Sequence, residues 1–266
     1  MDDKGNFAQN SVIRESGVWA MPYHESLQPC ADHAASHAVS ANAQSDLLHK
    51  LYHKLLAHYG DPNWWPAASR EEMMIGAILV QNVSWKNTVT ALHLVRERFG
   101  FTFRALREAP LDELAACIRA TRFYQSKAAR LQAFSFWIEA QCGDDLDRLF
   151  ARDAIELRRH LLSAPGIGPE TADDILLYAA ELPSFVIDSY TKRIMRRIAI
   201  GPERDTYEAW RSFFMERLPA DVLLYNRYHA LIDQLGSQVC RASRPLCTAC
   251  PLKTCCTYAR SQSSAD

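Results

Sequence analysis

The sequence lacks the features that mark membrane and secreted proteins. No uninterrupted apolar run approaches the ~18 residues that a membrane-spanning helix requires. The N-terminus, Met1-Asp2-Asp3-Lys4, has neither the basic nor the apolar segment of a secretory signal. We therefore expect a cytoplasmic protein whose eight cysteines sit in a reducing compartment, where metal ligation is favoured over disulfides.

An excess of charge of one sign is also absent, because 30 basic and 31 acidic residues give a net charge of −1. The chain as a whole is therefore not a polycation, yet its charge is unevenly placed. Between Gln234 and Arg260 there are several cations and no acid. Such a stretch can follow a phosphate backbone or can simply be a solvated face, and charge alone leaves both open. The cations of this stretch include Arg241, Arg244 and Lys253, and Lys192 and Arg193 belong to a basic cluster that precedes it.

The alternating pattern of β-strands is nearly absent, and apolar residues recur at helical spacing instead. We expect an all-α chain of about ten helices joined by short loops. The first should begin near Ser45, and residues 1–45 and 261–266 are expected to be tails, the first of them disordered. Further helices are expected at about 70–82, 85–99, 111–120, 125–141, 154–163, 169–180, 187–198, 205–217 and 221–236.

Four cysteines near the C-terminus are present at the spacing C-x6-C-x2-C-x5-C: Cys240, Cys247, Cys250 and Cys256. Four thiolates in so short a loop can close around one metal centre. A structural zinc site usually pairs two C-x2-C knuckles, whereas this loop has only one, which favours a [4Fe–4S] cluster. The spacing alone leaves zinc open, and Cys255 competes with Cys256 as the fourth ligand, although the register favours Cys256.

A tight turn, Pro165-Gly166-Ile167-Gly168, separates two predicted helices. Glycine allows positive φ and close approach of the backbone to another surface, so we expect both at Gly166 and Gly168. Pro169 suits the first position of the second helix, whose free N–H groups form an anion site. The turn is therefore either a phosphate-binding hairpin or a plain corner between helices.

An acidic residue, Asp188, follows three apolar residues and opens another predicted helix. Alone it is typical of an N-cap. The hairpin, an aspartate twenty residues after Gly168, and the cysteine loop follow one another in this order. Together they resemble the helix-hairpin-helix DNA glycosylases of the endonuclease III type over roughly residues 46–260. The resemblance implies that Asp188 is catalytic and that the cluster loop is structural, placing basic residues on DNA.

The resemblance also implies two helical domains. A six-helix barrel domain covers 69–185, with the helix-hairpin-helix at 154–180, and an iron–sulfur cluster domain joins 46–68 to 186–260. Gln81 and Asn82 resemble the family's helix-end residues that fill the gap left by an extruded base. Phe123 resembles the apolar wedge beside the orphaned partner base. Each of these also has an ordinary interpretation, as a capping amide or a core aromatic.

Trp64, Trp65 and Trp85 lie in segments that resemble the 3-methyladenine glycosylases of this type. Aromatic faces bind cationic bases by stacking and cation–π attraction, so these three residues are candidates for a base pocket. Trp64 and Trp65 are equally well explained as core residues between domains.

One departure from the family decides the expected chemistry. Bifunctional members carry a lysine two residues after the second hairpin glycine, and this chain has Glu170 there. A carboxylate cannot form the Schiff base that strand cleavage requires. We therefore expect hydrolysis only, with Asp188 stabilising an oxocarbenium-like transition state and activating water. Glu170 is either a first-turn acid favoured by the helix dipole or a second carboxylate near Asp188 with a raised pKa.

The expected substrate is double-stranded DNA containing a damaged base flipped out of the stack, and an alkylated purine is the favoured lesion. The protein is expected to act as a monomer away from membranes, associated with the nucleoid if its source is bacterial. Three alternatives stay open: a mismatch or uracil glycosylase, a bifunctional endonuclease III-like enzyme, and a non-catalytic DNA-structure binder on the same scaffold.

Overall fold

The computed structural model describes residues 40–263, which lie within one compact unit, Asp32–Asp266. Most of the tail expected for residues 1–45 lies outside the described residues, as do residues 264–266. The expected C-terminal limit of this tail was wrong, because helix α1 (Ala41–Tyr59) begins before Ser45. The side chain of Ser40 caps it by accepting a hydrogen bond from the backbone N–H of Ala43 at 3.3 Å.

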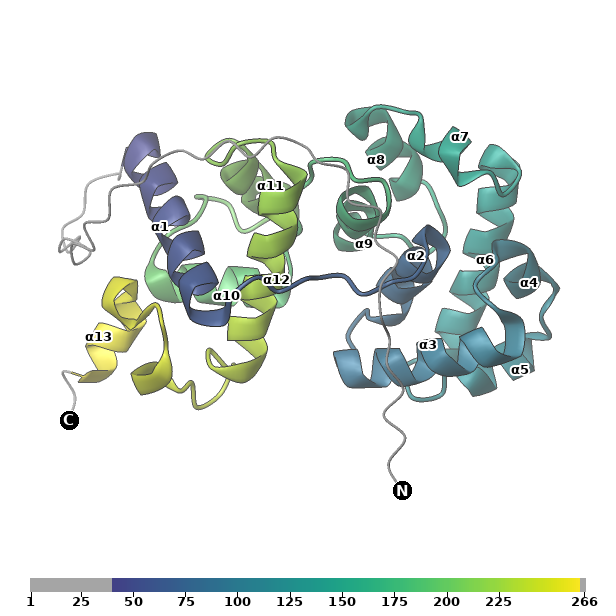
Figure 1. Cartoon of the computed structure of the whole chain (residues 1–266), viewed down its shortest axis with the longest axis horizontal. Coiled ribbons are helices and arrows are strands. Elements are labelled where there is room, and N and C mark those ends of the chain that lie inside the picture. The colour runs from purple at the N-terminus through teal and green to yellow at the C-terminus, as the bar shows by residue number, and fades with distance from the viewer. Residues whose placement is uncertain (1–39, 264–266) are drawn as a thin grey trace, which may run out of the picture. The chain divides into compact units, whose positions relative to one another are not determined.

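Every regular element within residues 40–263 is a helix, which confirms the all-α prediction (Figure 1). None of these helices is long and apolar enough to cross a membrane. The first group comprises α1, α10 (Ser189–Ile198), α11 (Tyr207–Met215), α12 (Val222–Gln238) and α13 (Thr257–Ser263). The second group comprises α2 (Arg70–Leu79), α3 (Trp85–Phe99), α4 (Phe103–Glu108), α5 (Leu111–Cys117), α6 (Tyr124–Cys142), α7 (Leu146–Phe150), α8 (Ala154–Leu162), α9 (Pro169–Asp174) and the π-helical turn η1 (Ile175–Ala179).

The second group surrounds an apolar core centred on α2, whose residues from Met73 to Leu79 are all buried. Burial all around α2 is expected of a helix enclosed by others, and α3, α6, α9 and η1 all contact it. In the first group α1 lies beside α12, and α12 beside α10. Phe185 and Phe214 stack there with ring centroids 4.1 Å apart, and the buried Tyr228 hydroxyl donates to the carbonyl of Leu48.

Several predicted boundaries differ from the structure for local reasons. The helices α4 and α7 are only 6 and 5 residues long, too short to show helical periodicity in the sequence. Helix α2 ends at Leu79, before Asn82 takes a left-handed backbone conformation with φ of 56°. The helix predicted over 169–180 is α-helical only to Asp174 and continues as the wider π-turn.

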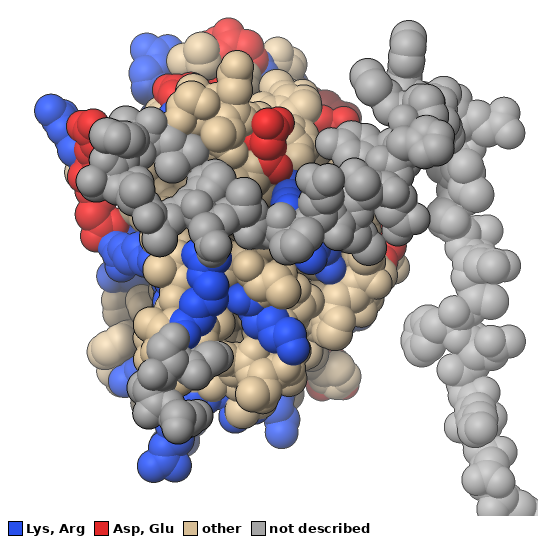
Figure 2. All heavy atoms as spheres, turned by 90° about the vertical axis from the view of Figure 1, so that its left-hand side faces the viewer, with Lys and Arg blue, Asp and Glu red and all other residues tan. Residues whose placement is uncertain are grey.

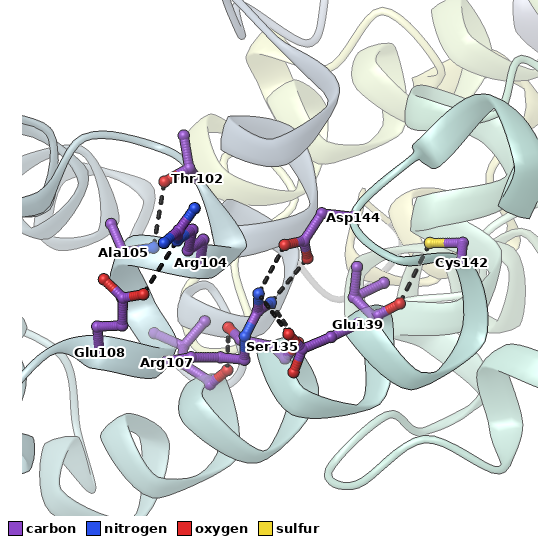
Figure 3. Close-up of polar contacts among 11 residues, drawn as sticks. Thr102, Arg104, Ala105, Arg107, Glu108, Ser135, Glu139, Cys142 and Asp144 are labelled. Carbon is purple, nitrogen blue, oxygen red and sulfur yellow. Dashed lines mark hydrogen bonds and ion pairs between the residues drawn. The ribbon is translucent and has the colours of Figure 1, made fainter.

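An ion-paired arginine fixes α4 against α6 (Figure 3). Both terminal nitrogens of Arg107 bind the carboxylate of Asp144, at 2.7 and 2.6 Å, and one also donates to the carbonyl of Ser135. Glu139 accepts a further hydrogen bond at 3.2 Å. The hydrogen bonds from Arg107 hold the pKa of Asp144 below its ordinary value. Arg107 thus fastens the turn after α6 to α4, far from the hairpin.

A second network centres on Asp173 in α9, which is fully buried. Arg158 of α8 donates to both of its carboxylate oxygens, at 2.9 and 3.0 Å. Arg211 of α11 donates to Oδ1 at 3.2 Å, and the hydroxyl of Ser184 donates to the same oxygen at 2.5 Å. One carboxylate therefore joins both helices of the hairpin to α11 and to the segment that leads to Asp188.

We expect Asp173→Asn to lower the free energy of unfolding by about 3–5 kcal/mol, because it leaves the half-buried guanidinium of Arg211 without its counter-charge and Arg158 with only the exposed carboxylate of Glu208. Urea denaturation followed by circular dichroism measures the loss. The matched control is Asp147→Ala, since Asp147 pairs with Arg70 at an exposed position, with 86% of its side chain accessible. An exposed pair contributes about 0–1 kcal/mol. Equal effects of the two substitutions would show that Asp173 does not brace the fold.

Candidate active site

Asp188 lies at the N-terminus of α10 and uses its two carboxylate oxygens differently. Oδ1 accepts a hydrogen bond from the backbone N–H of Thr191 at 2.6 Å, which caps the helix. Oδ2 lies 4.0 Å from Nε2 of His229. The three buried residues before it, Phe185, Val186 and Ile187, anchor the strand-like segment and fix where the cap begins. The N-cap interpretation is therefore confirmed, and the catalytic one stays a prediction.

Glu170 is the second residue of α9, immediately after Pro169. Its side chain is exposed to solvent, yet enough protein surrounds the carboxyl group to make ionisation unfavourable. Burial, and after it the nearby charge of Asp188, raise the pKa of Glu170 to about 7, while Lys192 opposes the shift. The structure thus brings Glu170 and Asp188 within electrostatic reach of one another.

Two further carboxyl groups belong to this cluster, and the sequence did not reveal them. Asp174 of α9 is buried, and burial together with Glu170, Asp173 and Asp188 raises its pKa well above the ordinary value. Asp233 of α12 has its pKa raised to about 6 by burial and by Asp188. Perturbed carboxyl groups gathered in one place are typical of functional sites.

Tyr178 and His229 complete the cluster and were also missed. The hydroxyl of Tyr178 lies 2.6 Å from Nδ1 of His229, 51 residues further along the chain. Burial raises the pKa of Tyr178 well above its ordinary value and lowers that of His229, so both groups are neutral near pH 7. Tyr178 stands in the π-turn η1, an irregularity that often accompanies functional sites.

Three tryptophans adjoin this cluster and form one aromatic group with Tyr178. Trp64, Trp65 and Trp85 contact one another with ring centroids 4.8 to 5.5 Å apart. Trp65 also contacts Tyr178, at 5.4 Å. Gly76 makes room for this packing, because a Cβ there would lie 3.2 Å from the Trp65 ring. The three rings are half-buried, so the structure brings together all three candidates for a base pocket and leaves part of each accessible.

Gln81, Asn82 and Phe123, the residues expected to enter the DNA duplex, line one pocket of about 300 Å³. Phe123 is 71% exposed and projects from the loop before α6. Gln81 is held back, since its side-chain nitrogen donates to the hydroxyl of Thr171 at 2.9 Å. It must release that bond before it can fill a gap in a base stack.

Lys127 also lines this pocket, and the sequence did not predict this position for it. It is 2% exposed, and its ammonium group donates to the carbonyls of Leu79 and Gln81, both at 2.8 Å. Burial lowers its pKa to about 8, with a smaller effect from Arg130. Lys127 therefore fixes the end of α2 and the loop that carries Gln81 and Asn82.

The hairpin turn confirms one of the two glycine expectations. Gly166 has a φ of 76°, and a Cβ there would lie 2.9 Å from the Arg130 side chain. This position therefore requires glycine for two reasons, its backbone conformation and the lack of space for a side chain. Gly168 was expected to share that conformation, and this was wrong. It is the N-cap of α9, with an extended φ of −93°, and a Cβ there would meet no atom within 4 Å.

The four predicted ligands gather after α12, where the short helices η2 (Cys247–Ala249) and η3 (Lys253–Cys255) shape the loop. Burial and the proximity of Cys240, Cys256 and Cys247 raise the pKa of Cys250 to about 11. All four thiols are free. Cys255, expected to be an ordinary thiol, is instead disulfide-bonded, which removes it as a rival ligand.

These four thiols fit a four-thiolate centre in their chemistry, and Cys240, Cys247 and Cys256 all lie within electrostatic reach of Cys250. Within residues 40–263 no set of three or more His, Cys, Asp or Glu side chains stands in a ready-made metal-binding arrangement. The loop is nevertheless braced by Arg197 of α10, which donates to Sγ of Cys240 at 3.1 Å and to the carbonyl of Arg241 at 2.8 Å. A cation beside the thiols stabilises their ionised, metal-binding form.

The predicted DNA-contacting cations divide into two sets. Arg193 donates to the carbonyls of Gly236 and Cys240, both at 2.9 Å, so its guanidinium braces the loop. Lys192 is half-buried and lies 3.9 Å from Asp205. Arg241, Arg244 and Lys253 are exposed. Figure 2 looks onto the side of α1 and α13, and Lys and Arg predominate in its lower half, where α13 lies, while most visible acids lie higher.

Comparison with known proteins gives a consistent result. The profile of the HhH-GPD superfamily base excision DNA repair protein family matches residues 75–220. The Methanocaldococcus jannaschii protein named "Putative DNA repair glycosylase MJ1434" is 39% identical over 212 residues, which are 79% of this chain and 96% of that protein. Endonuclease III of Sulfolobus acidocaldarius is 28% identical, over 70% of this chain and 80% of the relative.

Solved structures show the same fold. A non-covalent endonuclease III–DNA complex superposes with a TM-score of 0.72 at 18% identity, covering 83% of this chain and 98% of the other. The Helicobacter pylori 3-methyladenine DNA glycosylase bound to 1,N6-ethenoadenine gives a TM-score of 0.62 at 24% identity, covering 73% and 97%. At these identities the likeness is one of fold.

We expect Glu170→Gln to change how stability depends on pH. The folded-state pKa of Glu170 lies above its ordinary value of 4.5, so folding favours the protonated form. The free energy of unfolding is therefore highest below about pH 4.5 and falls as the pH rises through about 7. Glutamine removes this dependence, so the variant should gain stability over the wild type at about pH 8 and not at about pH 4.5.

Urea denaturation at both pH values measures this difference, and Glu203→Gln, at an exposed position, serves as the control. A Glu170→Gln variant that shows the same offset from wild type at both pH values would contradict the raised pKa.

Proposed function

Because the chain belongs to the HhH-GPD superfamily of base excision DNA repair proteins and is a DNA glycosylase of that superfamily, we propose that it hydrolyses the glycosidic bond of a damaged base without cleaving the DNA strand. One observation carries the proposal: Glu170 lies beside Asp188 at the position where the family resemblance places the lyase lysine. A carboxylate cannot attack C1′ as an amine. Lys127 is engaged with two backbone carbonyls, and Lys192, whose charge reaches Glu170, lies 3.9 Å from Asp205.

In this proposal the carboxyl groups of Asp188 and Glu170 have different catalytic roles. The carboxylate of Asp188 stabilises positive charge developing at C1′ and accepts a proton from water. Glu170, with a pKa of about 7, is protonated in a substantial fraction of molecules at neutral pH. A carboxyl group with a pKa near the working pH is well suited to protonate a neutral departing base such as hypoxanthine, whereas a cationic alkylated purine leaves without taking a proton. The same residue is thus unable to act as a nucleophilic amine and able to act as an acid.

We propose alkylated purines as the substrates. Alkylation at a ring nitrogen makes a purine cationic and a good leaving group. Trp64, Trp65 and Trp85 offer aromatic faces that attract a cation, and the carboxylates of Asp188 and Asp233 add negative potential close to Tyr178, which Trp65 contacts. A neutral base such as uracil gains neither interaction.

We further propose that a monomer binds duplex DNA through the hairpin and the exposed cations Arg241, Arg244 and Lys253. Phe123 would enter the stack beside the orphaned base, which needs an exposed apolar side chain at that point. Cys240, Cys247, Cys250 and Cys256 would hold a [4Fe–4S] cluster that stiffens the loop. Hydrolysis transfers no electrons, so the cluster supplies no step of the reaction.

The activity is tested with duplexes that each carry one lesion: 3-methyladenine, 7-methylguanine, hypoxanthine, uracil or an oxidised pyrimidine. Released base and strand nicking are scored separately. We expect release of the two methylated purines and no nicking without added alkali. Nicking, or an imine trapped by borohydride, would contradict the assignment of Glu170. Preferential release of uracil, or of thymine from a mismatch, would instead favour a mismatch or uracil glycosylase. An Aeropyrum pernix relative that is 26% identical bears the name thymine-DNA glycosylase.

Asp188→Asn should lower the rate of base release by at least ~100-fold while leaving DNA affinity within about threefold. Asparagine still caps a helix, so the fold is retained. The matched control is Asp221→Asn, because Asp221 caps α12 in the same way, through the backbone N–H of Leu224 at 2.8 Å. A wild-type protein that binds DNA and releases no base from any duplex would identify it as a DNA-structure binder.

We expect the purified protein to be brown, with charge-transfer absorbance near about 400 nm and about four iron atoms per chain. Cys250→Ser should abolish the colour, and Cys117→Ser, which alters a free thiol outside the loop, should not. Metal analysis by mass spectrometry checks both. A colourless protein with one zinc ion per chain would refute the cluster.

A further inference from the structure

His229 contains an unusual atom for a protein interior. The residue lies in α12 and is 8% exposed. Among the described residues its Nε2 has no hydrogen-bond partner, although it points to Oδ2 of Asp188, 4.0 Å away. A buried polar atom without a partner destabilises the folded protein, so its presence calls for an explanation such as a functional role.

The other ring nitrogen of His229, Nδ1, is held by Tyr178. The 2.6 Å contact joins the phenol oxygen to Nδ1 of His229. Burial and the surrounding carboxylates keep the proton on Tyr178, because they raise its pKa well above the ordinary value. The phenol therefore donates to Nδ1, and the neutral ring carries its own hydrogen on Nε2. The negative charge of Asp188 favours the same tautomer, since it faces that N–H.

Only one carboxylate oxygen of Asp188 is available for a further hydrogen bond. Oδ1 is engaged in the helix cap at 2.6 Å from the N–H of Thr191. Oδ2 is too far from Nε2 of His229 for a direct hydrogen bond. Two hydrogen bonds of about 2.8 Å that meet at one oxygen atom span such a separation at an angle of roughly 90°. The pair Nε2 and Oδ2 thus presents one donor and one acceptor to a single small polar molecule.

We propose that His229 is a positioning residue that holds the attacking water between its Nε2–H and Oδ2 of Asp188. This inference rests on the hydrolytic function proposed above. The water accepts a hydrogen bond from Nε2–H and donates one to Oδ2, which leaves a lone pair to face C1′. As its oxygen bonds to C1′, the C1′–N bond breaks with its electron pair going to the base, and the water proton passes to the carboxylate of Asp188. His229 neither gains nor loses a proton.

This role is distinct from that of Glu170. Glu170 serves the leaving base, whereas His229 and Asp188 serve the nucleophile. The two functions come from different elements, α9 for the acid and α10 with α12 for the water. Tyr178 reaches this ring from the π-turn η1.

The test compares His229→Leu with His229→Gln in single-turnover release of 7-methylguanine, together with the affinity for the same duplex. We expect His229→Leu to lower the rate constant by at least ~100-fold, with affinity within about threefold of wild type. His229→Gln should recover to within about tenfold of wild type, because its amide nitrogen supplies a donor. His93→Leu and His93→Gln, on the exposed His93, are the matched controls and should change neither quantity.

A spectroscopic measurement keeps the inference testable if the leucine variant does not fold. Nitrogen-15 NMR of the wild-type enzyme, with labelled histidine, should show His229 as the neutral Nε2–H tautomer, and Tyr178→Phe should weaken that preference. A neutral Nδ1–H tautomer would overturn the inference. So would a His229→Leu variant as fast as wild type, or a glutamine variant as slow as the leucine one.

The outcomes also separate this inference from the proposed function. If Asp188→Asn abolishes release and His229→Leu does not, the hydrolytic function stands and the role of His229 is wrong. If the wild type releases no base from any duplex, the hydrolytic function is wrong, and the role of His229 in it is overturned whatever tautomer the spectrum shows.

Discussion

The buried carboxylate of Asp173 is the interaction on which the candidate site depends. It binds Arg158 from the first hairpin helix, Arg211 from α11 and the hydroxyl of Ser184. Ser184 stands four residues before Asp188, and Glu170 stands three residues before Asp173 in the same helix. One ion-paired centre therefore connects the helix that carries Glu170 to the segment that leads to Asp188, the two residues to which we assign catalytic roles in our proposal. Breaking it would disturb their relative positions.

The site itself works against stability. Glu170, Asp174 and Asp233 all have raised pKa values, which means that folding opposes their ionisation. Like charges are brought together here at a cost to the fold, and the burial of Asp174 strengthens its repulsion with the neighbouring carboxyl groups. A cationic base entering beside Trp64 and Trp85 would relieve that repulsion. The arrangement that destabilises the free protein thus favours the substrate that we propose.

What the sequence could predict followed from local spacing. The cysteine loop, the turn at Gly166 and the cap at Asp188 each occupy a short segment, so each can be recognised from the residue spacing in the sequence. Tyr178 and His229 are 51 residues apart on unremarkable helix faces, and only the packing of η1 on α12 makes them partners. Arg193 looked like a DNA contact because charge is visible in sequence, whereas the carbonyls of Gly236 and Cys240 that engage it are not.

The exchange of a cation for an acid at residue 170 has a consequence beyond the loss of an amine. An ammonium group beside Asp188 would form an ion pair with it, and each group would hold the other in its charged form. A carboxyl group in the same place has the opposite effect, because two adjacent negative charges make proton uptake favourable. Lys192 offsets this only in part, since the pKa of Glu170 is still raised to about 7. In the function that we propose, this position therefore supplies a proton where bifunctional enzymes have a nucleophile, and water held at Asp188 takes the place of the amine.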